Sequence, residues 1–443
     1  MGDLAIVESR ADRASVHVCD HLRDLVSWEA RTDDARADAD GGGTYYRTEG
    51  IELRSFADLH LELERPAEAF DDPDLLVFAS RHSGETGPLL TGHFTGNFGP
   101  AEYGGDDYDL ADASPNALAR LFEAFDRHAP DGYDVGLECT HHGPTDVGCP
   151  SLFAELGSGD EQWDDPAGAA AVARAILELR DVDSHHRERL VGFGGNHYVP
   201  RFERVVRETP WAVGHVAADW SLEAMGDPET RRSVIESAFE TSDAEIALLD
   251  GDRPRLEGVI EELGYRVVSE TWVREVGDRS RSLADAVEAD LGTVDDGVRF
   301  GDRREESIAL VDLPTELVDA AESVDPDRVR SLVERESVAF ATENGGSRVG
   351  ARAAVPAAAA RAAREAIVDG LAAVLERKYE TVTREDGAVV VDDLAFDPKL
   401  AREAGVPEGP KFGALAEGES VTVDGETITP RSVFTRRTRR FPI

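Results

Sequence analysis

Lysine is nearly absent from this sequence of 443 residues: it occurs only at Lys378, Lys399 and Lys411, and every other basic residue is arginine. The 47 basic residues face 90 acidic ones, so the net charge is −43. Such an acid-rich, lysine-poor composition resembles that of proteins from organisms that accumulate salt. At molar salt the Debye length falls to about 3 Å, so acidic side chains repel one another far less. The charge therefore indicates a habitat, and it does not exclude a nucleic-acid partner.

Cysteine and long apolar runs are also scarce. Cys19, Cys139 and Cys149 are an odd number without CxxC spacing, which argues against a disulfide framework. No apolar run approaches the ~20 residues that a bilayer span needs, and no charged-then-apolar signal opens the sequence. We expect a cytoplasmic protein with no membrane partner. Its length suggests two or three domains.

The region of residues 1–285 alternates strand and helix patterns, which predicts an α/β fold with a mixed, mostly parallel sheet flanked by helices. Most of the expected strands are continuous apolar runs, as in strands covered on both faces; they are Leu4–Val7, Leu75–Ala79, Val135–Glu138, Leu190–Phe193, Ala212–Val216, Glu245–Leu249 and Tyr265–Glu270. The expected helices are Ser15–Trp28, Pro115–His128, Pro166–Leu179, Arg201–Glu208, Glu229–Glu240 and Arg255–Leu263.

Other segments depart from this alternation. Glu29–Tyr46 is acidic, Gly-rich and aperiodic, and we expect a surface loop insertion there. From Ser280 to Ser307 the apolar content drops, which suggests a linker or domain edge. Residues 286–443 then form an α+β extension of unknown role. It includes a helix that places Ile367, Leu371, Val374, Leu375 and Tyr379 on one face.

Histidines gather at the ends of four expected strands, where open α/β sheets place their sites. His82, His93 and Asn97 follow the second strand, and His141 and His142 follow the third. Gly194, Gly195, Asn196, His197 and Arg201 follow the fourth, and the fifth carries His215. A single histidine is more often structural than functional. Convergence from four strand ends favours a site.

The stretch "ECTHHGPT" contains two adjacent histidines. Neighbouring side chains of extended backbone point to opposite faces, so His141 and His142 can have different roles. Gly143 permits close backbone approach and Pro144 stiffens the chain. Glu138 can bind a metal, orient an imidazole or act as a base. The alternative is that Glu138 pairs with an arginine and one histidine simply packs.

Histidines and a carboxylate from separate loops suit Zn²⁺, although no HExxH-type signature is present. The metal-free alternative uses a histidine as general base, with Asn97 or Asn196 holding the substrate. "GFGGNHY" lacks the spacing of a nucleotide-binding loop, but the N–H groups of its glycines can cradle a phosphate or carboxylate.

Three blocks, "SRHSGETGPLLTGHFTGNFGPAEYGG", "ECTHHGPT" and "GFGGNHYVPRF", resemble the signature blocks of archaeal- and plant-type D-aminoacyl-tRNA deacylases. Their order and spacing agree over about residues 1–285, with the extension typical of a haloarchaeal long form. The resemblance implies hydrolysis of the ester between a D-amino acid and tRNA, with tRNA charged with a D-amino acid as the partner. We also expect a monomer. It also implies bound Zn²⁺, with two ions as a suggested stoichiometry, and a fold akin to phosphorylases and peptidyl-tRNA hydrolases.

The resemblance also suggests roles for the motif residues. We expect Glu138, His141 and His142 to be catalytic, and His82, His93 and His197 to bind metal. The expected substrate-binding residues are Asn97, Gly143, Pro144, Gly194, Gly195, Asn196 and Arg201. Cys139 occupies a small-residue position and is interpreted as incidental.

Two functions from other classes compete with this one. The first is a metal-dependent peptidase or amidase acting on small substrates, and the second is a non-catalytic tRNA-binding module whose histidines stack on bases. The stretch "RSVFTRRTRRFPI" bears on the partner, because its arginines either neutralise the acidic body or clamp phosphates.

Overall fold

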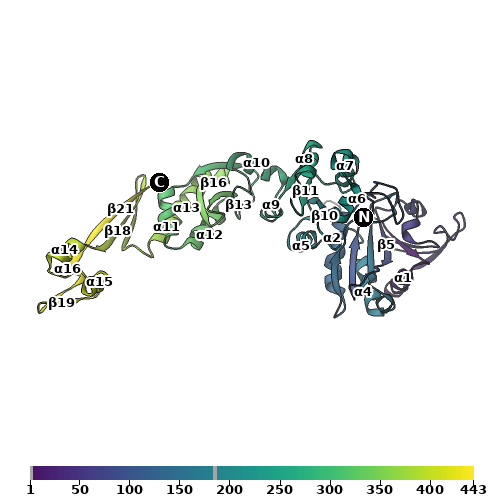
Figure 1. The fold of residues 1–443 in the computed structure, drawn as a ribbon, viewed down its shortest axis with the longest axis horizontal. Helices are drawn as coiled ribbons and strands as arrows, with labels where there is room; N and C mark the ends of the chain where they lie inside the picture. Colours follow the sequence, from purple (N-terminus) through teal and green to yellow (C-terminus); the bar gives the residue numbers. More distant parts are fainter. Residues whose placement is uncertain (1–2, 183–186) are drawn as a thin grey trace. The chain divides into compact units, whose positions relative to one another are not determined.

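The computed structural model describes residues 3–182 and 187–443, which divide into two compact units, Met1–Asp278 and Arg279–Ile443 (Figure 1). The larger sheet of the first unit has eight strands. In order across the sheet they are β2 (Glu29–Asp33), β3 (Gly43–Thr48), β4 (Ile51–Phe56), β1 (Leu4–Ser9), β5 (Leu75–Arg81), β8 (Ser151–Gly157), β6 (Leu89–His93) and β7 (Asp134–Leu137).

This sheet is mixed. The β4–β1–β5–β8 block is parallel, β6 runs antiparallel to β8, and β6 and β7 are parallel to each other. A second, parallel sheet contains β10 (Ala212–Ala217), β9 (Arg189–Phe193), β11 (Ile246–Leu249) and β12 (Arg266–Val268). All residues of β1, β8 and β10 are buried, as expected for strands covered on both faces.

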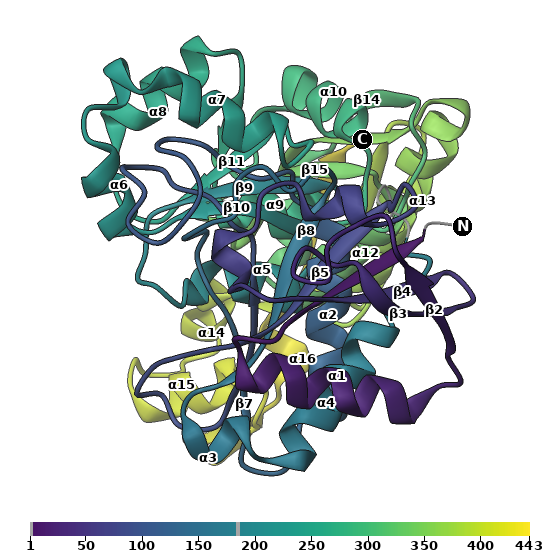
Figure 2. The same ribbon diagram turned by 90° about the vertical axis from the view of Figure 1, so that its right-hand side faces the viewer.

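Helices cover these sheets. The helices of the first unit are α1 (Arg13–Leu25), α2 (Pro115–His128), α3 (Asp160–Trp163), α4 (Pro166–Leu177), α5 (Pro200–Glu208), α6 (Asp219–Met225), α7 (Arg232–Glu240), α8 (Pro254–Glu262) and α9 (Glu270–Val276). Helices α1 and α4 pack side by side, α1 over β5 and α4 over β8 (Figure 2). Helix α2 contacts β6 of the first sheet and β10 of the second, so it joins the two.

The seven expected strands and six expected helices of this unit are present, with ends shifted by a few residues. The exceptions are instructive. Tyr265–Glu270 is a strand only over β12, and Glu270 already begins α9. The helix expected over Glu229–Glu240 is a 3₁₀ turn, Pro228–Thr230, followed by α7. The sheet confirms the mixed α/β class.

The expectation of a loop over Glu29–Tyr46 was wrong, because the segment contains β2 and most of β3. These strands pair antiparallel, with Ala30 opposite Tyr46 and Arg31 opposite Tyr45. Strand β2 lies at the sheet edge and is exposed, so it lacks the apolar alternation of a strand with one buried face. The guanidinium of Arg54 lies 4.0 Å from the centroid of the Tyr45 ring and packs on it.

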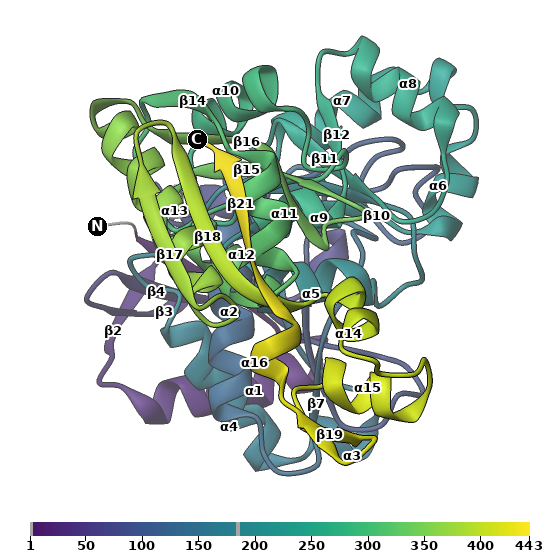
Figure 3. The ribbon, with the colours of Figure 1, turned by 90° about the vertical axis from the view of Figure 1, so that its left-hand side faces the viewer.

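The second unit is built from antiparallel sheets and helices (Figure 3). Its first sheet is ordered β13 (Val298–Phe300), β15 (Ala339–Glu343), β16 (Arg348–Pro356) and β14 (Ile308–Asp312). Its second is ordered β17 (Thr381–Glu385), β18 (Ala388–Phe396) and β21 (Phe434–Pro442), and its third pairs β19 (Val421–Val423) with β20 (Glu426–Ile428). The helices are α10 (Arg281–Leu291), α11 (Thr315–Glu322), α12 (Pro326–Glu336), α13 (Ala360–Leu375), α14 (Pro398–Glu403), α15 (Pro410–Ala416) and α16 (Pro430–Val433).

The segment Ser280–Ser307, expected to be a linker or a domain edge, begins just after the division between the two units, and it is not a linker because α10 buries Leu283, Val287 and Leu291 and is followed by β13. The apolar face expected for α13 is confirmed: Ile367, Leu371 and their neighbours are buried in the core of the unit. Among the described residues, no helix combines the length and apolar character that crossing a membrane requires.

Candidate active site

The expected cluster draws its residues from the ends of β5, β6 and β7, although β5 runs antiparallel to β6 and β7. His82 follows β5, His93 is the last residue of β6, and Glu138 follows β7. Because β6 and β7 are parallel neighbours, their ends bring His93 and Glu138 to the same edge. The loop after β9 is tied to this edge by the Cys139 N–H, which donates to the carbonyl of His197 at 2.9 Å. The sheet order therefore assembles residues that are far apart in sequence.

Glu138 is the centre of the cluster. Its carboxylate is buried, with Oε2 lying 2.7 Å from Nε2 of His197 and Oε1 3.1 Å from Nδ1 of His82. The first contact is a hydrogen bond, whereas the second has the distance but not the alignment of one. Burial raises the pKa of Glu138, but His197 and His82 outweigh burial and hold that pKa well below its usual range. Glu138 is thus an ionised carboxylate paired with histidines, and the alternative of an arginine partner was wrong.

Glu155 is a member of the cluster that sequence reasoning missed. It lies in the middle of β8, buried, with its two oxygens 3.6 Å from Nδ1 of His82 and 3.6 Å from Nε2 of His93. Burial lowers the pKa of His82, but Glu138 and Glu155 outweigh burial and raise that pKa to about 10. A glutamate within the apolar run "SLFAELG" was the available signal. Two buried carboxylates thus hold His82 protonated.

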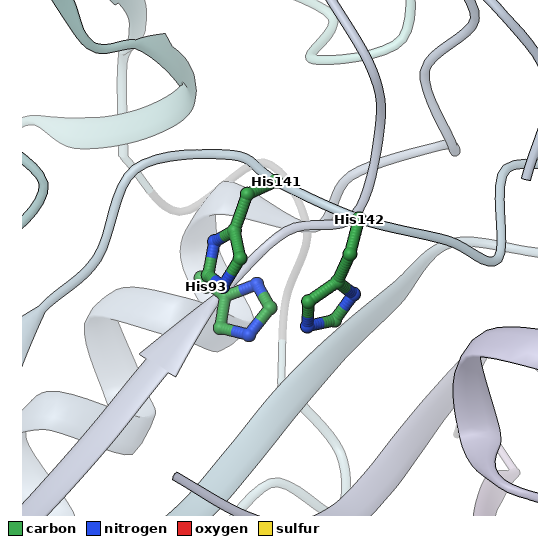
Figure 4. Close-up of side chains that lie close together, drawn as sticks. All are labelled: His93, His141 and His142. Carbon is green, nitrogen blue, oxygen red and sulfur yellow. The ribbon is translucent and has the colours of Figure 1, made fainter. Parts of the chain in front are cut away.

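Three histidines place their rings together (Figure 4). The rings of His93 and His141 stack with centroids 4.2 Å apart, and His142 lies edge-on to both. In each ring Nδ1 donates to a backbone carbonyl: of Phe94 for His93, Cys139 for His141 and Gly143 for His142. These bonds assign the ring proton to Nδ1 and leave each Nε2 available as a ligand atom.

Electrostatics keeps two of the three rings neutral. Burial, His93 and His142 lower the pKa of His141 well below its usual value. Burial and His93 likewise lower the pKa of His142 to about 4. Burial also lowers the pKa of His93, but Glu155 outweighs it and raises that pKa. A proton and a metal ion therefore compete for Nε2 of His93.

The donor atoms suit a metal ion such as zinc. Among the described residues, three groups bring ligand atoms within 4.8 Å of one another: His93, His141 and His142; Cys139, His141 and His197; and His82, Glu138 and Glu155. Only the first offers three imidazoles with preset tautomers, and Nε2 of His93 is buried without a hydrogen-bond partner. The ligands expected from sequence, His82, His93 and His197, fall in three different groups.

The backbone of the THHGP loop is unusual. His142 has φ of 45°, a left-handed conformation that non-glycine residues rarely adopt. A Cβ on Gly143 would lie 2.4 Å from the backbone of Gly104 and Gly105, so only glycine fits there. Asn97 stabilises the segment that contacts Gly143, because its Nδ2 donates to the carbonyls of Gly104 and Asp106. These residues brace the loop that carries His141 and His142.

Pro144 lines a pocket of about 430 Å³ on the same loop pair, together with Leu61, Arg65, Gly104 and Asp106. Cys139 faces the cluster as well, with Sγ 3.5 Å from Nδ1 of His197. Burial raises the pKa of Cys139 to about 12, which keeps it a neutral thiol. This agrees with its interpretation as incidental.

The residues expected to bind substrate after β9 are engaged within the chain. A Cβ on Gly194 would lie 2.2 Å from the carbonyl of Asp250, and the Gly195 N–H donates to Oδ1 of Asp219. Asn196 accepts a hydrogen bond from the backbone of Tyr198.

The side chains of Arg201 and His215 are also hydrogen-bonded within the chain. The guanidinium of Arg201 is held by Glu270, Asp250 and the carbonyl of Leu249. His215 uses both ring nitrogens, on Ala111 and Thr140, which makes it structural.

Comparison with known proteins places this site in a family. The D-aminoacyl-tRNA deacylase profile matches residues 69–268, a range that contains every residue of the cluster. The chain is 56% identical to the D-aminoacyl-tRNA deacylase of Natronomonas pharaonis over 443 residues, covering 99% of both chains. It is 52% identical to that of Halorubrum lacusprofundi, covering 99% of this chain and 97% of the relative. The chain belongs to the D-aminoacyl-tRNA deacylase family.

One solved structure extends the comparison. The crystal structure of a conserved protein of unknown function, AF0625, is 25% identical, with a TM-score of 0.57. The match covers 63% of this chain and 99% of AF0625. The deacylase relatives, in contrast, match this chain over nearly its whole length, so they share the extension as well as the site region.

Proposed function

We propose that this chain hydrolyses the ester between a D-amino acid and tRNA, and that the reaction takes place at the cluster around Glu138. Membership of the deacylase family supports the reaction. The observation that carries the assignment to this cluster is a buried, ionised Glu138 that orients His197 at 2.7 Å. An aminoacyl ester is already activated, so a positioned water and stabilisation of the developing oxyanion suffice.

In this mechanism His197 is the general base. Its Nε2–H is donated to Glu138, so Nδ1, which Cys139 Sγ approaches at 3.5 Å, carries the lone pair that accepts a proton from the attacking water once the water displaces the weak thiol contact. The Glu138 carboxylate then stabilises the imidazolium, as a carboxylate does in other acid–base dyads. His197 returns the proton to the ribose oxygen as the ester breaks. Its side chain is 34% exposed, against 1% for Glu138, so it is the more accessible of the pair.

We assign His93, His141 and His142 as the residues that hold Zn²⁺. Their preset tautomers and the unpartnered Nε2 of His93 support this choice. When bound there, zinc supplies Lewis acidity towards the ester carbonyl. We propose the second group, His82 with Glu138 and Glu155, for a second ion, whose binding would displace the proton that the two carboxylates hold on His82.

We propose that residues 1–285 are the catalytic domain, with a fold akin to phosphorylases and peptidyl-tRNA hydrolases. We also propose a monomer that acts in the cytoplasm at high salt. The chain's own composition supports the last point, since a net charge of −43 is tolerated best where salt screens it.

The test is deacylation of tRNA carrying matched D- and L-forms of one amino acid. Hydrolysis of the D-ester that is lost with Glu138→Gln supports the proposal. Cleavage of D-aminoacyl amides with no preference for the tRNA ester would indicate a peptidase or amidase. Binding of charged tRNA without turnover would indicate a binding module.

A further inference from the structure

The second unit carries an exposed strand of arginines. Strand β21 contains Arg436, Arg437, Arg439 and Arg440, which we call the arginine strand, and all four side chains are exposed. In its sheet β21 pairs with β18 on one side and forms the edge on the other (Figure 3). A ligand that lies along this edge is therefore within reach of long side chains from both faces of the strand.

The charge balance changes in this part of the chain. Residues 376–443 contain 11 basic and 13 acidic residues, a net charge of −2, whereas the whole chain carries −43. All three lysines of the chain, Lys378, Lys399 and Lys411, lie in this segment. Residues 428–443 contain five arginines and no acid. A polyanion that the acidic composition of the chain as a whole repels meets little local repulsion along this last stretch.

Three of these arginines, Arg436, Arg437 and Arg439, have no acidic partner among the described residues. Most other arginines pair with Asp or Glu, and Arg440 itself pairs with Glu385. Arg439 contacts the hydroxyl of Tyr379 at 3.4 Å. The side chains of Arg436 and Arg437 form neither an ion pair nor a hydrogen bond within the described residues, although Asp393 lies directly opposite Arg437 in the β18–β21 register. Pairing with acidic residues of the same chain therefore does not explain Arg436 and Arg437.

The guanidinium groups of the arginine strand are distributed over both faces of β21 and along its length. Arg437 and Arg439 share a face with Phe441, which is buried beside Val389, and Arg436 and Arg440 share the opposite face. Arg436 to Arg440 span about 14 Å along the strand. A nucleic-acid strand carries one phosphate per ~3.4 Å of axis, so several phosphates lie within that length.

We propose that the arginine strand is a contact surface for the phosphate backbone of the tRNA substrate. The proposal rests on the proposed function for the identity of the nucleic acid. Arginine binds phosphate through two parallel N–H donors, so it retains geometric affinity where salt weakens long-range attraction. The other possible occupant, the acidic surface of a second copy of this chain, is separated from tRNA by the test.

The experiment compares two double variants of the full chain. Arg436→Ser/Arg437→Ser removes the two arginines of the strand whose side chains form neither an ion pair nor a hydrogen bond within the described residues. The matched control Arg361→Ser/Arg402→Ser removes two exposed arginines of the same unit that are ion-paired, to Glu365 at 2.9 Å and to Glu408 at 3.0 Å. Both variants change the net charge equally. Circular dichroism checks the fold, and Arg436→Gln/Arg437→Gln replaces the serine variant if that variant unfolds.

The readouts are the Kd for uncharged tRNA over a series of KCl concentrations, and KM and kcat for two esters, D-aminoacyl-tRNA and 3′-D-aminoacyl-adenosine. For the arginine-strand variant we expect a Kd and a KM for tRNA raised about five- to tenfold, with kcat unchanged. The slope of log Kd against log salt should fall by about 2, and the short ester should be unaffected. The control should match wild type.

Equal behaviour of both variants would overturn the proposal, as would an equal response of the two esters. A change in oligomeric state without a change in tRNA affinity would assign the arginine strand to contacts between copies and would also overturn it. These outcomes are distinct from failure of the proposed function. That failure would appear as no turnover of either ester by wild-type protein, whereas the Kd for uncharged tRNA tests the surface by itself.

Discussion

His93, His141 and His142 differ from the other described histidines of the cluster in how their ring nitrogens are used. In each of these three rings the Nδ1–H donates to a backbone carbonyl and Nε2 stays available. In contrast, Nε2 of His197 contacts Glu138, and Nδ1 of His82 contacts two carboxylates. The backbone carbonyls fix the tautomer, so the three Nε2 atoms form a donor set before any ion binds. This pattern separates residues that hold zinc from residues that move protons.

Zinc affinity tests whether these three histidines hold the ion. His93→Ala should weaken zinc affinity at least about 100-fold, because it removes a ligand and a second-sphere change alone costs 10- to 100-fold. His128→Ala is the control, since His128 is bound to Glu178 at 2.7 Å, away from the cluster. Zinc affinity is measured by competition with a chelator, without any assay of turnover. An unchanged affinity in His93→Ala would show that zinc binds elsewhere.

At the scale of helices and strands, Glu270 connects two elements behind the site. It is the first residue of α9 and receives Arg201 and Arg204 from α5, with Arg204 Nη2 at 2.6 Å from Oε2. Hydrogen bonding from Arg204 outweighs burial and lowers the pKa of Glu270 to about 2. Helix α5 follows the loop that carries His197, so this ion pair supports the position of the general base.

The pH dependence of stability tests this contact. A carboxyl whose pKa is lowered on folding stabilises the native state above its unfolded pKa of about 4.3, and that contribution is lost as pH falls towards 2. Glu270→Gln should therefore lower the free energy of unfolding by about 1 kcal/mol at pH 7, and the difference from wild type should shrink below about pH 4. Denaturant unfolding from pH 7 to pH 3 measures it, with the exposed Glu261→Gln as control. A difference that does not vary with pH would contradict this account.

The strands and site residues of the first unit differ in how well the sequence predicts them, and the reasons are physical. Strands such as β1 and β9 are continuous apolar runs, which is the pattern that sequence shows most clearly. Strand β2 is exposed at a sheet edge, so its pairing leaves no such pattern. The histidines and Glu138 were predictable from their positions after strands. Glu155 was not, because its role depends on β8 lying between β5 and β6, an order that no local pattern encodes.

At the scale of the whole molecule, the chemistry and the proposed tRNA surface lie in different units. All cluster residues lie between 82 and 197, and the arginine strand belongs to Arg279–Ile443. The match to AF0625 covers 99% of that chain but only 63% of this one. AF0625 therefore folds without a counterpart of the rest of this chain. The first unit should therefore fold alone.

Truncation tests this division. A chain ending after Asp278 should fold, keep kcat for 3′-D-aminoacyl-adenosine within about twofold, and show a raised KM for charged tRNA, because it lacks the arginine strand. Circular dichroism at high salt and steady-state kinetics measure these properties. An unfolded or inactive first unit would show that the second unit completes the catalytic core.

The most direct test of the account is release of labelled amino acid from D-tyrosyl-tRNA and L-tyrosyl-tRNA by wild-type protein and by Glu138→Gln. Wild type should hydrolyse the D-ester at least about 100-fold faster than the L-ester. In Glu138→Gln the rate for the D-ester should fall at least about 100-fold, because His197 loses the carboxylate that orients it and stabilises its protonated form. Equal hydrolysis of the two esters, or a Glu138→Gln variant as fast as wild type, would contradict the account.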